Sequence, residues 1–210
     1  MTDWVDSHCH LHMAEADPAV LLDRAGEAGV SWLVCPGTDA AGSRAALDLA
    51  AAHPDRILAA VGLHPHDASR WPDEEDELVA LADGAVAIGE CGLDFYRNLS
   101  PREAQLAAFR AQVALAEDRD LPLIVHVRDA FREMYDELES SGEGPRTVLH
   151  CWTGGPRWTK RFDALGVTFS FAGPITYPKG ETVRLAAAVA PTERTMVETD
   201  TPYLTPPPNR

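Results

Sequence analysis

The stretch Trp4-Val5-Asp6-Ser7-His8-Cys9-His10 decides the interpretation of the fold, because it joins a short apolar strand to two histidines. Successive side chains of a strand point to opposite faces, so the imidazoles of His8 and His10 are expected on one face. Two neutral imidazoles on one face can bind a metal ion. The motif alone leaves an alternative open, namely one buried structural histidine beside one exposed histidine.

Seven further apolar, β-branched runs follow this first one, with amphipathic stretches rich in Ala, Leu, Glu and Arg between them. Strands that alternate with helices predict parallel β/α units, and eight such units predict an α/β fold of the (β/α)8 TIM-barrel type. No GxGxxG or GxxxxGK[ST] motif follows a strand, which argues against a dinucleotide fold and a P-loop. The predicted strands span residues 4–6, 30–35, 57–62, 85–89, 121–127, 147–150, 167–170 and 195–198.

Helix boundaries are marked by residues with known end preferences. Asp17 is the predicted N-cap before Pro18, and Gly29 is predicted to stop that helix. The stretch Ser100-Pro101-Arg102-Glu103 predicts a capping box at the start of a long helix. Helices are also predicted over 101–119, 129–140, 156–165 and 179–190, whereas the acidic stretch 67–76 is predicted to be a solvated loop.

The predicted barrel lacks its final C-terminal helix. After the eighth strand the sequence reads Thr201-Pro202-Tyr203-Leu204-Thr205-Pro206-Pro207-Pro208-Asn209-Arg210, where a complete barrel would have a helix. We therefore expect uncovered apolar barrel surface between the first and seventh helices. No linker or change of composition divides the chain, so residues 1–210 are predicted to form one domain.

The bulk properties narrow the function classes. The chain has 210 residues, 45% of them hydrophobic, which is a globular composition. Its net charge of −15 argues against a broad duplex-binding face, but not against a pocket where metal ions hold one or two phosphates. Four scattered cysteines predict reduced thiols. Without a long apolar run or a basic leader, no membrane association is expected and the cytoplasm is favoured, while the oligomeric state stays open.

Ligand-type side chains gather at the carboxyl ends of the predicted strands, where barrel enzymes hold their active sites. Imidazole and carboxylate together suit Mg²⁺, Mn²⁺, Zn²⁺, Fe²⁺ or Ni²⁺. Six ligands are too many for one catalytic ion with an open position, so they predict two ions bridged by a carboxylate, for which Glu90 is the natural candidate. The predicted ligands are His8, His10, Glu90, His126, His150 and Asp200.

Further residues near these ligands have both a functional and a structural interpretation. His64 is expected at the mouth, as a phosphate contact, a proton donor or a structural histidine. Asp200 is also a candidate proton acceptor, and Glu198, two residues earlier, is expected to orient a ligand. Arg128 is a candidate phosphate contact or a partner in a local ion pair. Tyr96 is a candidate for base stacking or for packing.

Three cysteines, Cys9, Cys91 and Cys151, each stand beside a predicted ligand. Strand alternation points their side chains away from the ligand face, so packing in the core is predicted for all three. His12 and His66 are expected on the rim of the barrel rather than among the catalytic residues.

Six motifs stand in order along nearly the whole chain: Asp6-Ser7-His8-Cys9-His10-Leu11, Gly62-Leu63-His64-Pro65-His66, Gly89-Glu90-Cys91-Gly92-Leu93-Asp94-Phe95-Tyr96, Pro122-Leu123-Ile124-Val125-His126, His150-Cys151-Trp152-Thr153-Gly154 and Glu198-Thr199-Asp200-Thr201-Pro202-Tyr203-Leu204-Thr205-Pro206. Together they resemble the motifs of the TatD family of metal-dependent deoxyribonucleases, in the amidohydrolase-like barrel superfamily. Trp152-Thr153 departs from the Phe-Ser or Phe-Thr that usually follows the family's cysteine, and Trp152 is expected to stack on a base or to pack on the loop.

The resemblance implies a hydrolase of DNA phosphodiester bonds that acts on single strands or 3′ ends, with Mg²⁺ or Mn²⁺ as the usual ions. The implied ligands of one ion are His8, His10, Asp200 and Glu90. The implied ligands of the other ion are Glu90, His126 and His150. Two alternatives stay open: a barrel hydrolase of a non-nucleic-acid ester, amide or lactone, and an inactive metal-binding scaffold.

Overall fold

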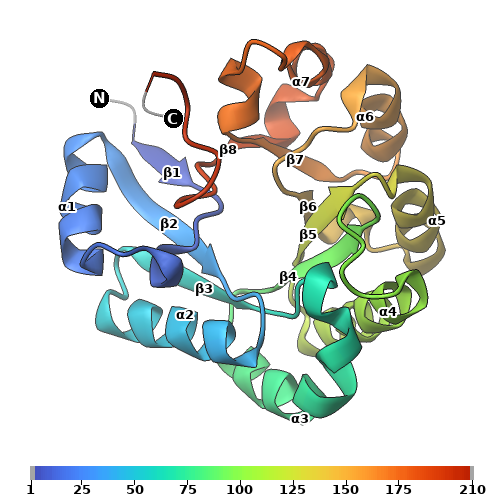
Figure 1. Cartoon of the computed structure of the whole chain (residues 1–210), viewed down its shortest axis with the longest axis horizontal. Helices are drawn as coiled ribbons and strands as arrows, with labels where there is room; N and C mark the ends of the chain where they lie inside the picture. Colours follow the sequence, from blue (N-terminus) through green and yellow to red (C-terminus); the bar gives the residue numbers. More distant parts are fainter. Residues whose placement is uncertain (1–2, 209–210) are drawn as a thin grey trace.

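Eight parallel strands follow one another in sequence order in our computed structural model, which describes residues 3–208. The predicted strand count, order and direction are confirmed, and Figure 1 shows the strands arranged around a barrel with helices outside. The strands are β1 (Trp4–Asp6), β2 (Val30–Pro36), β3 (Ile57–Val61), β4 (Ala87–Asp94), β5 (Leu123–Arg128), β6 (Thr147–Leu149), β7 (Thr168–Phe171) and β8 (Thr195–Val197).

The first and last strands meet at the seam of the barrel. The backbone N–H of Ser7 donates to the carbonyl oxygen of Val197 at 3.1 Å, and the N–H of Asp200 donates to the carbonyl oxygen of His8 at 2.9 Å. These bonds bring residues near the two ends of the chain side by side (Figure 1). The nearly closed barrel therefore places residues that follow β1 beside residues that follow β8.

Seven α-helices surround the sheet within residues 3–208 (Figure 1). The predicted cap at Asp17 is confirmed, because its side chain accepts the backbone N–H of Ala19 at 2.8 Å with Pro18 in the first turn. Gly29, with φ of +86°, follows this helix as predicted. The helices are α1 (Pro18–Glu27), α2 (Ala40–Ala52), α3 (Trp71–Leu81), α4 (Arg102–Arg119), α5 (Phe131–Ser141), α6 (Gly155–Asp163) and α7 (Glu181–Ala187).

The acidic stretch 67–76 is helical, so the prediction of a solvated loop was wrong. A 3-10 turn (Pro65–Arg70) leads directly into α3. Trp71 and Leu78 lie seven residues apart on the buried face of α3, and the side chain of Glu74 accepts a backbone N–H at the start of α2 at 2.8 Å. The acidic residues on the outer face hid the helical spacing of these apolar residues.

The predicted capping box at Ser100 is also wrong. The hydroxyl of Ser100 donates to the carbonyl oxygen of His66 at 2.8 Å and accepts the backbone N–H of Ser69 at 3.2 Å. No described side chain caps α4, which begins at Arg102. Ser100 therefore joins the start of α4 to the loop after β3 instead of closing its own helix.

Strand β4 continues five residues beyond the predicted end, so Glu90 lies inside the strand. All eight of its residues are buried. Gly92, with φ of +135°, permits this path, because a Cβ atom there would lie only 2.0 Å from the carbonyl oxygen of His126. The glycines that suggested a strand end instead allow close approach between β4 and β5.

The outer face of the seam is apolar and exposed, as the sequence predicted. No helix follows β8 within the described residues, and all three residues of β8 are exposed. Figure 1 shows this region between α1 and α7. No helix among the described residues is long and apolar enough to cross a membrane. The exposed apolar side chains on β1, β2 and β8, on α1 and α7, and just after α7 are Trp4, Val20, Trp32, Leu185, Val189, Met196 and Val197.

Candidate metal centre

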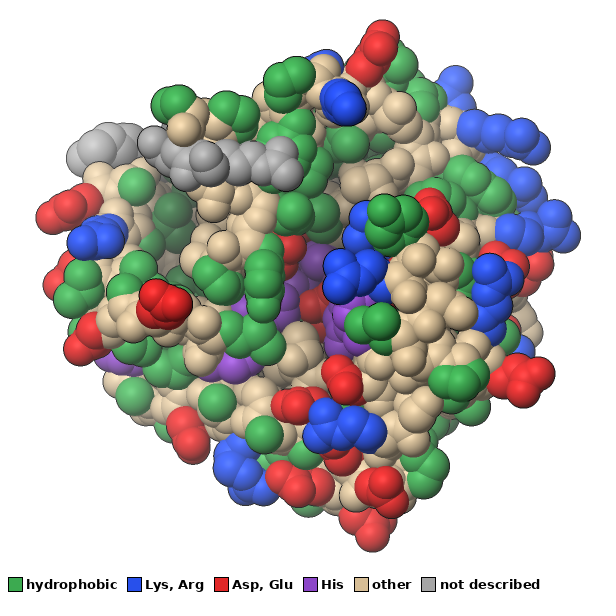
Figure 2. Space-filling model, in the orientation of Figure 1, with side chains coloured by type: hydrophobic (Ala, Val, Ile, Leu, Met, Phe, Trp, Pro, Cys, Tyr) green, Lys and Arg blue, Asp and Glu red, His purple; other side chains and the backbone are tan. Residues whose placement is uncertain are grey.

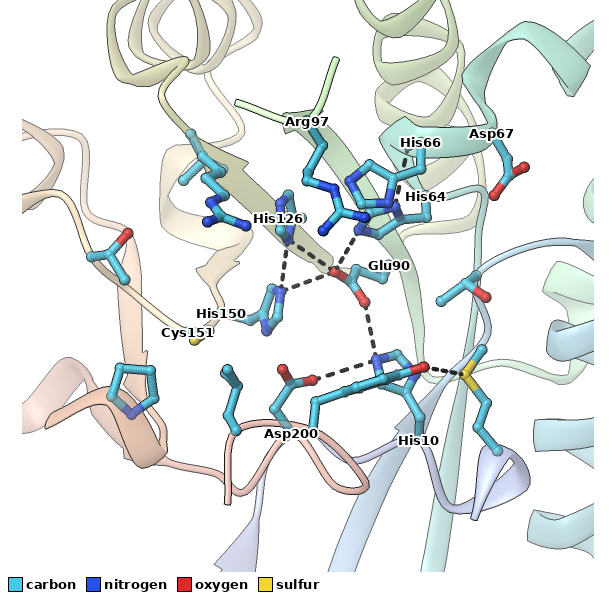
Figure 3. A pocket seen from close by; sticks show the side chains of 18 residues that line it. His10, His64, His66, Asp67, Glu90, Arg97, His126, His150, Cys151 and Asp200 are labelled. Carbon is cyan, nitrogen blue, oxygen red and sulfur yellow. Dashed lines mark hydrogen bonds and ion pairs between the residues drawn. The ribbon is translucent and has the colours of Figure 1, made fainter. Parts of the chain in front are cut away.

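The Glu90 carboxylate lies at the centre of the barrel mouth (Figure 3). Its Oε1 atom lies 2.9 Å from Nε2 of His150, 3.2 Å from Nδ1 of His126 and 3.3 Å from Nε2 of His64. His64 and His150 follow β3 and β6, and His126 lies within β5, so the barrel itself brings the three histidines together. One oxygen of Glu90 is therefore shared by the histidines on the β3, β5 and β6 side.

The second oxygen of Glu90 faces the seam. Its Oε2 atom lies 3.3 Å from Nε2 of both His8 and His10. The Oδ1 atom of Asp200 lies 3.9 Å from Nε2 of His8 and 3.5 Å from Nε2 of His10. The six ligand-type residues singled out in the sequence thus meet in one cluster, with Glu90 between two groups.

The donor set around His10 fits a cation. The Nδ1 atom of His10 lies 3.1 Å from the carbonyl oxygen of Pro36, which only accepts, so Nδ1 carries a proton. In a neutral ring, Nε2 then presents a lone pair to the Glu90 oxygen and to Nε2 of His8, 3.2 Å away. Lone pairs that face one another at this range need a positive charge between them, which a metal ion or a bound proton supplies.

Carboxylates and a backbone carbonyl lie beside the outer nitrogens of three ligand histidines, His10, His126 and His150. Oε1 of Glu198 lies 3.4 Å from Nδ1 of His150, and the hydroxyl of Ser170 donates to the other oxygen of Glu198. The structure therefore places Glu198 where the sequence expected it, behind a ligand and facing the barrel interior. Such a partner fixes the ring orientation and the tautomer of a metal ligand.

Asp94 is a site residue whose role sequence reasoning missed. Its Oδ2 atom lies 3.3 Å from Nε2 of His126 and 2.8 Å from Nε2 of His66. Asp94 is four residues after Glu90 in β4, and the period of two along a strand puts both side chains on one face. This spacing was the signal that could have identified it.

His64 differs from the other four histidines around Glu90. Its Nδ1 atom accepts the backbone N–H of His66 at 3.2 Å, so a neutral ring carries its proton on Nε2. Burial lowers the pKa of His64 to about 4, which keeps the ring neutral near pH 7. His64 therefore offers an N–H donor toward Oε1 of Glu90 rather than a lone pair.

Burial and neighbouring charges act in opposite directions on the pKa values of the cluster. Burial alone would raise the pKa of Glu90, but the nearby imidazoles, His150 first, hold it well below its usual range. Burial opposes protonation of His150 as well, yet the charges of Glu90 and Glu198 raise the pKa of His150 well above its usual range. For Asp200, burial and the charge of Glu90 outweigh His150 and raise the pKa to about 6.

The cluster opens into a pocket of about 660 Å³, a size typical of small-ligand sites. Figure 2 shows the hollow at the centre of this face, with histidines inside it and Lys or Arg side chains along one side. Among the described residues that line the pocket, Arg97 and Arg128 are the only Lys or Arg side chains. The guanidinium of Arg128 lies 3.9 Å from the ring centre of Tyr96, and no described residue forms an ion pair with it. Arg128 is therefore free to contact a ligand.

The remaining predictions have mixed outcomes. Cys9 and Cys91 are buried in the core as predicted, but Cys151 is half-buried and lines the pocket. The prediction for Cys151 relied on regular strand alternation, but Cys151 has a φ of +44° and is not in extended conformation. Trp152 packs in the core with 1% exposure, and its indole N–H donates to Thr159 at 2.7 Å, so it offers no surface to a base.

His66 lines the pocket near its edge, consistent with the rim. His12 lies half-buried beside Cys35, with its Nδ1 atom 3.3 Å from the sulfur, and it does not line the pocket. Neither ring contacts Glu90.

Comparisons with known proteins assign the chain to a family. The family model "TatD related DNase" matches residues 5–210. The 3′-5′ ssDNA/RNA exonuclease TatD of Pectobacterium carotovorum subsp. carotovorum (strain PC1) is 41% identical over 197 residues, covering 91% of this chain and 76% of that protein. The crystal structure of YJJV, a TatD homologue from Escherichia coli K12, matches with a TM-score of 0.91 at 29% identity, covering 97% of this chain and 81% of that chain.

A more distant barrel enzyme shares the fold alone. The β-aspartyl dipeptidase of Fervidobacterium islandicum AW-1 matches with a TM-score of 0.59 at 12% identity, over 94% of this chain and 58% of that chain. The resemblance that rested on six sequence motifs is confirmed by the family model and by the curated relatives. The chain belongs to the TatD family of DNases.

Proposed function

We propose that this protein is a metal-dependent hydrolase that removes nucleotides from the 3′ ends of single-stranded DNA. The observation that carries the proposal is that the two carboxylate oxygens of Glu90 face different ligand groups. Oε1 faces His126 and His150, whereas Oε2 faces His8 and His10. A carboxylate that offers one oxygen to each of two ligand groups is suited to bridge two ions.

Two divalent ions fit the donor set. His8, His10 and Asp200 would hold one ion with Glu90, and His126 and His150 would hold the other with Glu90. Mixed imidazole and carboxylate ligands suit Mg²⁺ or Mn²⁺, with Zn²⁺, Fe²⁺ and Ni²⁺ as alternatives. When bound, such ions lower the pKa of an attacking water and neutralise charge on the attacking and leaving oxygens of a phosphoryl displacement.

The surrounding side chains supply the proton and hydrogen-bond chemistry. Asp200, whose carboxylate lies 3.5 Å from Nε2 of His10 at the edge of the cluster, is suited to accept a proton from the attacking water. The Nε2–H of His64 is suited to donate to a phosphate oxygen near Glu90, because the neutral ring keeps this proton. Arg97 and Arg128 line the pocket and are suited to contact further phosphates of the strand.

The charge distribution favours a strand end over a duplex. The net charge is −15, and only two of the Lys or Arg side chains in residues 3–208 line the pocket. A duplex footprint relies on many cation–phosphate contacts, whereas a strand end in a pocket needs few. The curated relative named above is a 3′-5′ exonuclease of single-stranded DNA and RNA, which supports the same substrate class.

The test uses a 5′-labelled single-stranded oligonucleotide with Mg²⁺ or Mn²⁺. We expect products that shorten one nucleotide at a time from the 3′ end, and no products with a chelator or with Glu90→Gln. The same strand annealed as a blunt duplex should be cut more slowly, and an RNA strand shows whether the sugar matters. Absence of metal-dependent cleavage, with Glu90→Gln indistinguishable from the unmodified chain, would refute the proposal.

The two alternatives are distinguished by the same preparation. A panel of lactones, carboxylic esters and amides tests the carbonyl hydrolases, because the same ions polarise carbonyl groups. An inactive scaffold would bind ions and cleave neither class. Metal-dependent turnover of a carbonyl substrate without turnover of DNA would show that the protein is a carbonyl hydrolase and not a nuclease.

A further inference from the structure

The two sides of the pocket differ in chemistry. Arg97 and Arg128 line it on the side of β4 and β5, and Figure 3 shows the Arg97 side chain directed into the pocket. The opposite side, next to Asp200 and His10, is formed by apolar and aromatic side chains. We call this second side the apolar wall; it consists of Met13, Pro174, Tyr203 and Leu204. Figure 2 likewise shows hydrophobic side chains bordering the hollow opposite the basic ones.

Tyr203 is the one aromatic side chain of the apolar wall. Its ring centre lies 6.1 Å from that of His10, and its backbone N–H donates to the carbonyl oxygen of Asp200 at 2.8 Å. The hydroxyl lies 3.7 Å from the sulfur of Met13. The side chain is nevertheless 53% exposed. An exposed ring is thus fixed beside two ligand-type residues.

The loop that bears Tyr203 is anchored on both sides of this residue, at Thr201 and at Leu204. The backbone N–H of His10 donates to the carbonyl oxygen of Thr201 at 2.7 Å. On the other side, the carbonyl oxygen of Leu204 packs so closely against Gly173 that a Cβ atom there would lie 1.8 Å from it. The ring is therefore presented by a built wall of the pocket rather than by a free arm.

We propose that the apolar wall binds the terminal nucleoside of the strand, with its base on Tyr203, and that Arg97 and Arg128 bind phosphates of the remaining strand. This inference rests on the proposed nuclease function and adds an orientation to it. A terminal nucleoside has no phosphate beyond its sugar, so its side of the pocket needs no cation. The remaining strand has a phosphate at every nucleotide, so its side does.

The scissile phosphate then lies between the walls, at Glu90. The base that leaves stacks on an aromatic ring, a contact that accepts any of the bases because each has a π face. The fold therefore selects strand ends: an internal position would place a second charged phosphate against the apolar wall. Tyr203 is a substrate-binding residue in this account.

The test compares oligonucleotides that differ only at the terminal nucleotide, which carries either a base or an abasic sugar. With the unmodified protein, loss of the terminal base should lower kcat/KM for its release by about tenfold. Tyr203→Ala should release the terminal nucleotide about tenfold more slowly and should no longer distinguish the two substrates. Tyr203→Phe should keep the distinction, since the ring remains.

Tyr96→Ala is the matched control, because it removes a similarly exposed ring that stacks with Arg128 and does not line the pocket. The ratio between the two substrates should stay unchanged in this variant. A second readout uses 2-aminopurine as the terminal base in the Glu90→Gln background. Its fluorescence should be quenched by stacking when the strand binds, and this quenching should be lost with Tyr203→Ala.

The outcomes separate the inference from the function on which it rests. If the protein cleaves no nucleic acid, the proposed function fails. If it cleaves DNA but Tyr203→Ala still distinguishes the two ends as the unmodified protein does, the terminal-base assignment alone is overturned. It is also overturned if Tyr203→Ala responds only to an abasic sugar one position inside the strand, because the strand would then lie in the opposite orientation.

Discussion

His64 and His10 both face the Glu90 carboxylate through Nε2, but this nitrogen is a hydrogen-bond donor in His64 and carries a lone pair in His10. The backbone N–H of His66 occupies Nδ1 of His64, so its Nε2 faces Glu90 as a donor. In His10 a carbonyl oxygen fixes the opposite tautomer. Both rings lie 3.3 Å from an oxygen of Glu90, yet they are suited to different tasks. The backbone contact at Nδ1 of each ring distinguishes them, because it sets the tautomer.

We expect His64→Ala to bind metal ions like the unmodified protein while its kcat falls about 10²-fold, a typical loss for one donor to a charged oxygen. His64→Gln should recover part of this loss, because its amide N–H can reach the position of Nε2. His126→Asn is the contrasting variant and should lose one ion. Calorimetric metal titration beside oligonucleotide kinetics checks both. Loss of an ion with His64→Ala would make His64 a ligand.

Metal affinity should rise with pH. The charges of Glu90 and Glu198 overcome burial and raise the pKa of His150, and Asp94 and Glu90 do the same for His126. In the metal-free protein these rings hold protons over more of the neutral range, so a binding ion must displace them. Each displaced proton gives about a tenfold gain in affinity per pH unit.

The measurement for this pH effect is a Mn²⁺ titration at pH 6, 7 and 8 in buffers of different ionisation enthalpy, which also counts the released protons. Glu198→Gln is the matched variant, because it keeps the shape of the side chain but removes a charge that raises the pKa of His150. Its affinity should depend less steeply on pH. An affinity that does not change between pH 6 and 8 would contradict the assignment.

At the scale of elements, the seam between β1 and β8 is the weakest part of the site. Backbone bonds join it at Ser7 and at Asp200, but all three residues of β8 are exposed. By contrast, β4 and β5, which supply Glu90 and His126, are largely buried. Local opening is favoured where few buried contacts resist it.

We therefore predict unequal metal affinity at the two ligand groups. The group at the seam, with His8 and His10, should bind its ion more weakly than the group with His126 and His150. Calorimetry should resolve two classes of Mn²⁺ sites, of which His10→Asn removes the weaker and His126→Asn the tighter. Equal affinities, or the reverse assignment, would show that the exposed seam does not loosen its ligands.

The sequence predicted the strands well because each is a short apolar run between breaks. It predicted that the six ligand-type residues meet, because barrel geometry gathers residues at the carboxyl ends of successive strands in one ring. It failed for α3, where acidic residues on the exposed face masked Trp71 and Leu78, and for β4, where glycine resembles a strand end. In both cases tertiary packing outweighed the local preference.

Part of the site was not accessible to sequence reasoning. The role of Asp94 follows from strand alternation, but only once β4 is known to extend that far. The carbonyl oxygen of Pro36, which sets the tautomer of His10, is a backbone atom and leaves no mark in the sequence. The turn at Cys151 is another such case, because its positive φ is imposed by the fold rather than by glycine.

At the scale of the molecule, a net charge of −15 contrasts with the two arginines of the pocket. Long-range repulsion of nucleic acid is screened by salt, whereas contacts inside the pocket are screened less. The proposed strand-end mode engages about two phosphates through cations, for which the slope of log(kcat/KM) against log[salt] should be about −1.4. Arg128→Gln should reduce this slope by about half.

Kinetics between 50 and 400 mM salt at fixed Mn²⁺ check this slope. Replacement of a cation far from the pocket, such as Lys160→Gln on α6, should leave it unchanged. A slope several times steeper would indicate a broad basic footprint, which the charge of the molecule and its pocket do not provide.

The bridging role of Glu90 is tested most directly by counting bound ions with and without its charge. Calorimetric titration with Mn²⁺ should give two ions per chain for the unmodified protein. Glu90→Gln should bind at least one ion more than 10-fold more weakly and should not cleave single-stranded DNA, because the bridge between the groups of His8 and His150 is lost. Two ions bound with unchanged affinity by Glu90→Gln would contradict the account.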